Sequence, residues 1–335
     1  MRAPDFWQRA RRSPWPFLLL PLSRLWRLAF ALRQRRARPL RLGVPVICVG
    51  NLVVGGAGKT PTVLALAKRL QAQGVAVHVI SRGYGGRKKG PLLVDPARHA
   101  ASEVGDEALL LGRSAPTWIG RRRQSAAQAA VAAGAAALLL DDGYQDPALV
   151  KDLSLVVVDA DYGFGNGRVL PAGPLREPVE SGLARADAVL LIGAAATAAA
   201  EIMPDRRRSP VPLLRAEIRA EPIAPPLQGA GVIAFAGIGR PEKFFATLTA
   251  QGCRLLATHA FPDHHAYRPA EIRRLVTQAR DAGARLLTTQ KDQVRLGPDA
   301  PAEVEALAVT LHFADEAALE RLLAPLLARI LHAGT

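Results

Sequence analysis

Cysteine and aromatic residues are scarce in this chain of 335 residues. The two cysteines, Cys48 and Cys253, lack the spacing of a CxxC motif or a metal site. This pattern argues against a disulfide scaffold or a structural zinc site, and it fits a reducing compartment. Aromatic residues make up only 5% of the chain, and neither an aromatic platform nor a domain-wide basic stripe is present. We therefore expect no nucleic-acid partner, and nothing in the sequence indicates an obligate protein partner.

Acidic residues are also few, 29 against 44 lysines and arginines, which gives a formal net charge of +15. Such a balance points to nucleic acid, an anionic lipid or a phosphorylated substrate. Residues 1–41 hold eleven arginines and a single acidic residue, Asp5, so most of the excess charge belongs to the N-terminal segment. The length, together with 49% apolar and 22% charged residues, indicates globular protein in two domains.

The sequence has no long hydrophobic run free of charge, because Arg24 and Arg27 interrupt the apolar segment 15–32. Its nine leucines and phenylalanines favour membrane insertion by about 4 kcal/mol in total, whereas each central arginine costs roughly 2.5–3.5 kcal/mol. A transmembrane span is therefore marginal or unfavourable. As a helix, the segment has Arg24, Arg27 and Arg35 opposite an apolar face formed by Leu18, Leu22, Leu25, Ala29 and Leu32.

This two-faced pattern predicts an amphipathic helix lying in an anionic membrane surface, with its tryptophans at the headgroup level. Two other interpretations stay open. One is an ordinary helix packed on the core. The other is a cleaved signal peptide, because a basic stretch precedes the apolar residues and Ala29-Phe30-Ala31 resembles a cleavage site.

From residue 44 the chain alternates buried strands and helices, which is typical of a parallel α/β sheet. We expect strands at 44–49, 75–81, 135–140 and 153–158, an edge strand at 188–192, and helices at 60–73, 106–111 and 123–133. A second set follows, with strands at 231–236, 254–258, 285–289 and 307–312 and helices at 241–251, 269–282 and 316–330.

Between these two sets, six prolines and the basic cluster Arg206–Arg208 break the alternation of strands and helices. We therefore predict four parts: a membrane-associating helix (1–41), an α/β domain that contains a glycine-rich turn (42–202), a linker with a short strand at 213–218 (203–229), and a smaller α/β domain that closes over the first (230–335).

The clearest motif is a glycine-rich turn between the first strand and the first helix of the α/β domain. It consists of Val53, Val54, Gly55, Gly56, Ala57, Gly58, Lys59 and Thr60. In such a P-loop, backbone N–H groups and the helix N-terminus hold the phosphates of a nucleotide. Lys59 would then reach the β- and γ-phosphates, and Thr60 would ligate Mg²⁺. The match departs from G-x-x-x-x-G-K-[ST] at Val53, so Gly55 and Gly56 are expected to form the turn.

A second carboxylate for the metal is expected after another buried strand. Asp141 and Asp142 follow the strand at 135–140. Because the carboxyl ends of parallel strands meet at one edge of a sheet, Asp141 should lie beside the P-loop. The sequence therefore predicts a site for ATP and Mg²⁺.

Eight short motifs occur in order over residues 44–292, at 50–51, 55–61, 81–86, 105–107, 141–145, 167–177, 261–264 and 291–292. Together they resemble the tetraacyldisaccharide 4'-kinase family of lipid A synthesis. The resemblance implies transfer of the γ-phosphoryl group of ATP to the 4'-hydroxyl of a tetraacylated glucosamine disaccharide 1-phosphate, which yields lipid IVA. It also implies two α/β/α domains, and an N-terminal helix at the cytoplasmic face of the bacterial inner membrane.

The resemblance also implies roles for single residues. Asp106 would accept the proton of the acceptor hydroxyl, His264 would partner it, and Glu107 would join the shell of the metal. His265 is the neighbour most easily confused with His264, because the family usually has an aromatic residue there.

Four further residues are candidates for the acceptor's binding site: Arg82, Arg121, Asp142 and Asn166. The planar fork of an arginine suits a phosphate, although 121–123 fits a solvated helix start equally well. Asn166 lies in a glycine-rich loop that suits either sugar contact or a plain turn. A different function also stays open, a membrane-bound GTPase or partitioning-type ATPase switch, because residues 289–292 resemble a guanine-reading loop.

Overall fold

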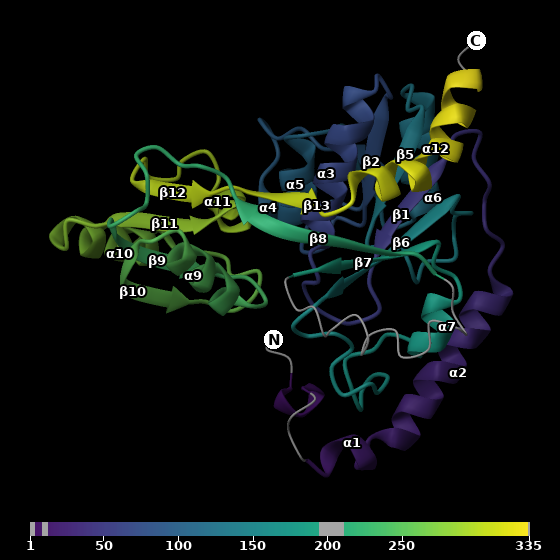
Figure 1. Cartoon of the computed structure of the whole chain (residues 1–335), viewed down its shortest axis with the longest axis horizontal. Helices are drawn as coiled ribbons and strands as arrows, with labels where there is room; N and C mark the ends of the chain where they lie inside the picture. Colours follow the sequence, from purple (N-terminus) through teal and green to yellow (C-terminus); the bar gives the residue numbers. More distant parts are fainter. Residues whose placement is uncertain (1–3, 9–12, 194–210, 334–335) are drawn as a thin grey trace.

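Two β-sheets organise the chain (Figure 1). The structure is a computed structural model and describes residues 4–8, 13–193 and 211–333. Within these residues the larger sheet has nine strands in the order β13-β8-β7-β6-β1-β5-β2-β4-β3. They are β1 (Val46–Gly50), β2 (Val77–Ser81), β3 (Leu92–Leu93), β4 (Thr117–Ile119), β5 (Ala137–Asp141), β6 (Leu153–Asp159), β7 (Ala188–Ile192), β8 (Leu213–Ala220) and β13 (Val309–Phe313). The sheet is parallel except for β13 and β3 at its edges.

Successive residues of the central strand β1 point to opposite faces of the larger sheet and into two separate cores. Ile47 and Val49 join the core under α3 (Lys59–Ala72) and α12 (Glu316–Ala333). Val46 and Cys48 join the core under α6 (Arg123–Ala132) and α7 (Val179–Leu183). Because both faces are covered, the central strands are apolar along their length.

The smaller sheet is wholly parallel, in the order β10-β9-β11-β12. Its strands are β9 (Gly231–Ala236), β10 (Arg254–Ala260), β11 (Arg285–Thr289) and β12 (Val304–Leu307), and its helices are α9 (Pro241–Ala250), α10 (Pro269–Asp281) and α11 (Gln290–Leu296). We call residues 231–307 the smaller unit. The larger unit is the larger sheet with the helices packed on it, including α4 (Ala101–Val104) and α5 (Asp106–Gly112).

Three expectations from the sequence need correction. Strand β7 is not at an edge, because β6 and β8 flank it. The predicted linker 203–229 contains the eight-residue strand β8, which lies inside the larger sheet between β7 and β13; residues 203–210, with the cluster Arg206–Arg208, are outside the described residues. The single strand expected at 307–312 is two strands, β12 and β13, which belong to different sheets.

This last difference changes the division of the chain. After β12 the chain returns to the larger sheet, where β13 pairs antiparallel with β8 and α12 joins the core beside α3. The predicted boundary at residue 230 therefore does not separate the two units completely. The last part of the chain, with β13 and α12, belongs to the larger unit.

The N-terminal segment contains η1 (Asp5–Trp7), α1 (Trp15–Leu18) and α2 (Leu20–Arg36). Figure 1 shows α2 along the outside of the larger unit, near α7. The buried residue of α2 is Ser23, whose hydroxyl donates to the carbonyl of Val169 at 2.8 Å. Trp26 Nε1 donates to the carbonyl of Arg176 at 2.9 Å. A few polar contacts thus hold α2 against the larger unit.

The leucines of this segment face outward. Exposed fractions between 40% and 66% are found for Leu18, Leu22, Leu25, Leu28 and Leu32. A helix packed on the core would bury this face instead. Within the described residues, no helix has both the length and the apolar character needed to cross a membrane.

Candidate active site

The carboxyl ends of three neighbouring parallel strands gather the predicted site residues at one edge of the larger sheet. β1 leads into the P-loop, β5 ends at Asp141 and β2 ends at Ser81. The Ser81 hydroxyl donates to Asp141 Oδ2 at 3.4 Å. This edge is where ligands bind in open parallel sheets.

The backbone of the P-loop shows why Val53 can replace the first glycine of the usual motif. Val53 forms a β-bridge with Leu175 and is not among the residues with positive φ, so its backbone does not need glycine. Gly58 does need it, because its φ is +90° and an added Cβ would lie 2.5 Å from Ile192 Cδ1. Thr60 follows in the first turn of α3 and is buried.

Lys59 and Asp142 are held close together beside the P-loop. Lys59 Nζ donates to Asn51 Oδ1 at 3.2 Å and lies 3.6 Å from Asp142 Oδ1. Arg176 donates to both carboxylate oxygens of Asp142, at 2.9 and 3.0 Å. Burial alone would raise the pKa of Asp142, but the charges of Lys59 and Arg176 outweigh it and lower the pKa to about 2. Asp142 is therefore an ionised group with a fixed orientation.

Asp141 has the environment of a metal ligand. Its Oδ1 is buried and makes no hydrogen bond. Burial, followed by the nearby charges of Glu107 and Asp142, raises the pKa of Asp141 to about 7. A bound cation would satisfy the bare oxygen and offset this repulsion.

Besides Asp141, the sequence predicted Thr60 and Glu107 as metal ligands. Among the described residues no cluster of three or more His, Cys, Asp or Glu side chains is arranged to hold a metal. Mg²⁺ usually keeps several waters and takes one or two carboxylates, so Asp141 with Thr60 fits it. Glu107 is less free, because Lys291 Nζ lies 2.5 Å from its Oε1.

Asp106 and His264 meet across the two units. Asp106 begins α5 and is 5% exposed, and His264 lies in the loop after β10. His264 Nδ1 lies 2.9 Å from Asp106 Oδ2. Gly105 makes the turn before Asp106, since its φ is +91° and a Cβ there would lie 2.3 Å from the carbonyl oxygen of Tyr84.

The two groups shift each other's pKa in opposite directions. The hydrogen bond with Asp106, despite partial burial of the ring, raises the pKa of His264 above its usual value. Burial would raise the pKa of Asp106, but the hydrogen bond with His264 and the charge of Arg295 hold it well below its usual range. The arrangement is an ionised carboxylate that orients an imidazole.

His264 has an unusual backbone conformation. Its φ is +57°, and its N–H donates to the carbonyl of Gly237 at 3.1 Å. The ring of Tyr84 lies against the imidazole, with 5.4 Å between ring centroids. His265, in contrast, pairs with Glu271 at 3.0 Å and stacks on Phe261. The neighbouring histidine is therefore not the one that meets Asp106.

The sequence analysis missed α11, which carries two cations to the site. Lys291 contacts Glu107, and Arg295 Nε donates to Asp106 Oδ2 at 2.6 Å. The local signal was present, because Thr289 caps the helix by accepting the N–H of Asp292, which is the start of a helix with Ser or Thr followed three residues later by an acid.

Asp292 does not form an open base-reading site. It is fully buried, and its Oδ1 accepts hydrogen bonds from the Gly237 N–H, the Tyr267 hydroxyl and Arg295. Its Oδ2 accepts from the Thr289 hydroxyl at 2.6 Å. These partners occupy the carboxylate that a guanine would need.

A second ionic bridge joins the units on the other side of the P-loop. Arg240 contacts Asp159 and donates to the carbonyl of Gly56 at 2.9 Å. Lys243 Nζ lies 2.7 Å from Asp159 and 2.6 Å from Asp161. This bridge connects the start of α9 to the end of β6 and to the P-loop, and no sequence motif indicated it.

The remaining predicted residues have different surroundings. Arg82 and Arg121 are exposed, after β2 and β4 respectively. Asn166 joins its own loop to the N-terminal segment: its Nδ2 donates to the carbonyls of Ala172 in the loop and Phe6 in η1, and its Oδ1 accepts the N–H of Arg168. The geometry of Asn166 is that of a residue that holds the loop.

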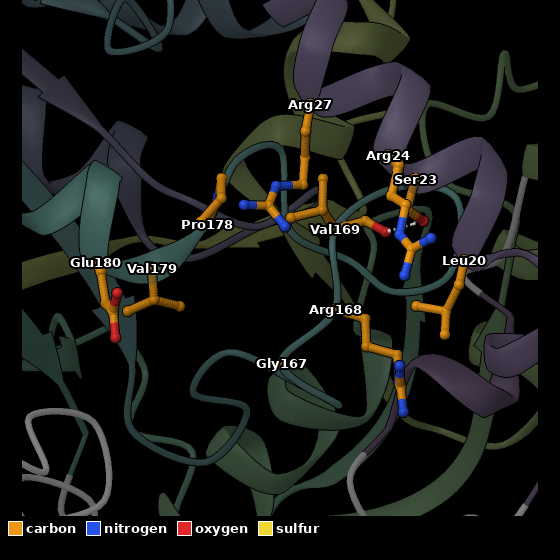
Figure 2. A pocket seen from close by; sticks show the side chains of 10 residues that line it. All are labelled: Leu20, Ser23, Arg24, Arg27, Gly167, Arg168, Val169, Pro178, Val179 and Glu180. Atoms are coloured by element: carbon orange, nitrogen blue, oxygen red, sulfur yellow. Dashed lines mark hydrogen bonds between the residues drawn. The ribbon is translucent and has the colours of Figure 1, made fainter. Parts of the chain in front are cut away.

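A cavity of about 460 Å³ lies between α2 and the loop that contains Val169. Figure 2 shows Arg24 and Arg27 extending from α2 toward this loop, with Leu20 beside them and Val179 on the opposite wall. The cavity therefore combines cationic and apolar groups. Its arginines were predicted for a membrane-facing helix but not for a pocket.

Comparison with known proteins identifies relatives of this chain. The family model described as "LpxK: Tetraacyldisaccharide-1-P 4'-kinase" matches residues 15–328. A tetraacyldisaccharide 4'-kinase of Gluconacetobacter diazotrophicus is 55% identical over 324 residues, or 96% of this chain and 97% of that protein. One of Rhodospirillum rubrum is 51% identical over 328 residues, again 96% and 97%.

A solved structure of LpxK from Aquifex aeolicus, described as an "apo" form in complex with ATP, aligns with a TM-score of 0.74. It is 28% identical and covers 93% of this chain and 99% of the other. Because the match in sequence and in structure extends over nearly the whole chain, this protein belongs to the tetraacyldisaccharide-1-P 4'-kinase family.

Proposed function

We propose that this protein is an ATP-dependent kinase that transfers the γ-phosphoryl group to the 4'-hydroxyl of a tetraacylated glucosamine disaccharide 1-phosphate, forming lipid IVA. One observation supports it most directly. The imidazole of His264 and the carboxylate of Asp106 lie 2.9 Å apart. They are close to the P-loop, because the charge of Lys291 and also that of Lys59 lower the pKa of Glu107, the residue next to Asp106. A phosphoryl acceptor with a hydroxyl group needs such a proton acceptor close to the bound nucleotide.

We assign the nucleotide to residues 53–60. Backbone N–H groups of the loop and the N-terminus of α3 hold the phosphates, and Lys59 stabilises the negative charge that develops on the transferred group. Asp141 and Thr60 would hold Mg²⁺, which neutralises phosphate charge when bound. Glu107 joins this shell only when Lys291 releases it. Asp142 keeps Lys59 in place before the nucleotide binds.

We assign the acceptor hydroxyl to the Asp106–His264 pair. A sugar hydroxyl does not ionise at neutral pH, so a positioned proton acceptor contributes roughly 10²–10⁴-fold to the rate. Because the two residues come from different units, closure of the smaller unit on the larger one completes the pair and limits transfer to water. Arg82 and Arg121, which are exposed at the same edge, are candidates for the 1-phosphate.

We further propose that α1 and α2 lie in the cytoplasmic face of the bacterial inner membrane. The support is the row of outward leucines with arginines at its flanks, which suits an anionic interface. The cavity between α2 and Val169 would then receive part of the lipid acceptor as it leaves the bilayer. The alternative of a GTPase or partitioning-type switch loses its main support, because the carboxylate of Asp292 is already occupied.

The test is transfer of label from [γ-³²P]ATP to the purified lipid disaccharide monophosphate. Wild-type protein should form a labelled product only when the acceptor is present. Lys59→Ala should abolish this transfer while the circular dichroism spectrum stays the same, because the side chain contributes charge rather than packing. Nucleotide hydrolysis that is independent of the acceptor would favour the switch instead.

A further inference from the structure

One guanidinium, that of Arg295, contacts the carboxylate of Asp106 and the backbone carbonyl that anchors His264. The side chain of Arg295 is 6% exposed, and its Nε and Nη2 lie 2.6 and 2.5 Å from Asp106 Oδ2. Its Nη1 donates to the carbonyl of Gly237 at 2.5 Å. That same carbonyl accepts the backbone N–H of His264 at 3.1 Å. Arg295 therefore touches the side chain that orients His264 and the peptide that anchors it.

These contacts leave Asp106 few positions from which to accept a further proton. Its Oδ2 already receives His264 Nδ1 and Arg295, and its Oδ1 accepts the N–H of Glu107 at 2.8 Å. The carboxylate is also buried. The imidazole of His264 is different, because its side chain is 33% exposed and its Nε2 is 3.9 Å from Asp263 Oδ2, beyond hydrogen-bond distance.

Resting on the proposed function, we propose that Arg295 is a positioning residue. It fixes the carboxylate of Asp106 and the backbone of His264, and so holds the Asp106–His264 pair in the orientation that proton transfer from the acceptor hydroxyl requires. As the hydroxyl oxygen bonds to the γ-phosphorus, the bond from that phosphorus to the β–γ bridging oxygen breaks and ADP leaves with this oxygen. The proton moves to Nε2 and later passes to solvent. Asp106 stays ionised throughout and keeps its hydrogen bond to Nδ1–H.

The geometry explains why this residue is an arginine. Its contacts point in different directions, toward Asp106, Gly237 and Asp292. A planar fork with five N–H donors reaches all three at once, whereas an ammonium group on a flexible stem does not. Val294, next to it, is fully buried in an apolar cluster with residues of α4 and α5, which fixes α11 in place.

The first test is kinetic. With the lipid acceptor saturating and ATP varied, Arg295→Met should lower kcat roughly 10²-fold, as expected for misplacement of a catalytic group, with little change in KM for ATP. Arg295→Lys should recover part of this loss. In a His264→Ala background, Arg295→Met should add less than about threefold, because the residue it positions is gone. If the loss of kcat in the double variant equals the product of the two single losses, the proposal is wrong.

Arg285→Met is the matched control. Arg285 also makes a paired contact with a carboxylate, Glu305, at 2.8 and 2.5 Å, but within the smaller sheet. Its replacement should leave kcat within about twofold, because Arg285 is at the start of β11 whereas Arg295 lies in α11, beyond the end of that strand. An equal loss of kcat in both variants would show that Arg295 acts only through stability, and the proposal would fail.

The second test does not depend on turnover. In protein labelled with ¹⁵N-histidine at about pH 9, where an imidazole of ordinary pKa near 6.5 is neutral, His264 should carry its proton on Nδ1. His264→Ala identifies the signal. In Arg295→Met, or in Arg295→Lys if the first variant does not fold, the other tautomer should become populated. Unchanged tautomers would refute the role of Arg295, whereas wild-type protein without transfer activity would refute the proposed function alone.

Discussion

At the scale of single residues, the candidate site is where the backbone is strained. Among the described residues, Asp142 and His264 are the two non-glycine residues with positive φ, +51° and +57°. Such a conformation costs on the order of 1–3 kcal/mol. Each is held by its surroundings, Asp142 through Arg176 and His264 through Gly237. Both side chains are therefore fixed before any ligand binds.

The raised pKa of His264 predicts an acid limb in the rate profile. Protonated imidazole cannot accept a proton, so kcat/KM should fall as the pH decreases through the pKa of His264. Because the hydrogen bond with Asp106 raises that pKa above 6.5, the limb should lie above pH 6.5 and the rate should level off at higher pH. His264→Gln should remove the limb. A limb at or below pH 6.5 in wild-type protein would contradict the assignment.

Asp141→Asn tests the metal site without changing the P-loop or the Asp106–His264 pair. A neutral amide is a poor ligand for Mg²⁺, so the Mg²⁺ concentration for half-maximal activity should rise by roughly tenfold or more, about 1.4 kcal/mol. Without Mg²⁺ the variant should melt at a higher temperature than wild type, because it no longer buries a carboxylate whose pKa is raised by burial and by repulsion from Glu107 and Asp142.

The control for this substitution is Asp152→Asn, a carboxylate just before β6 that pairs with Arg41 and Arg329. It should leave the Mg²⁺ titration unchanged. An unaltered titration in Asp141→Asn would assign the metal to other ligands.

At the scale of elements, α2 is unusual because it presents leucines to the outside and polar contacts to the protein. Its attachment rests on Ser23, Trp26 and Gln34, each of which makes a side-chain hydrogen bond to a backbone carbonyl of the larger unit. This is the reverse of an ordinary amphipathic helix on a globular domain. The outward face therefore needs another apolar environment.

We predict that Leu25→Glu combined with Leu28→Glu reduces sedimentation with vesicles containing anionic lipid. Burying a leucine is worth roughly 1.5–3 kcal/mol, so the two changes should weaken partitioning at least tenfold. Deleting residues 1–38 should do the same, and activity should fall more on substrate in bilayers than in detergent. Leu93→Glu, at a leucine that is 44% exposed on β3, should have no effect. Unchanged sedimentation would assign the anchor to another surface.

At the scale of the whole molecule, two polar bridges hold the smaller unit against the larger one. One joins His264, Arg295 and Lys291 to Asp106 and Glu107, and the other joins Arg240 and Lys243 to Asp159. The P-loop is connected to the second bridge through the carbonyl of Gly56. The position of the smaller unit is therefore linked both to the proton acceptor and to the nucleotide site.

Asp159→Asn should weaken the second bridge and raise KM for ATP. A buried hydrogen bond to a charged group contributes about 1.5–3 kcal/mol, so we expect roughly a tenfold increase measured at saturating acceptor. Asp161→Asn is the control, because its side chain is 61% exposed and pairs with the same Lys243, and it should change KM little. Equal effects of both substitutions on KM for ATP would show that Lys243, rather than Arg240 at the P-loop, links this bridge to ATP binding.

The sequence alone determined the elements whose cause is local. The strand, glycine turn and helix at 44–73 were predicted because the apolar run, the small residues and the helix formers are adjacent in the chain. Asp141 could be placed beside the P-loop because parallel strands bring their carboxyl ends to one edge. The ordered motifs indicated the family, and with it Asp106 and His264.

Only the tertiary structure decided what depends on distant partners. β8 looked like part of a linker because its place in the sheet comes from pairing with β7 and β13, and β13 lies about ninety residues further along the chain. No sequence pattern indicated a role for Arg295. Its role depends on contact with Asp106, which is 189 positions away in the chain. The outward turn of the leucines on α2 was decided in the same way, by the few polar groups to which Ser23 and Trp26 attach. An apolar pattern shows that a helix has two faces, but the contacts of the folded chain determine which face is left exposed.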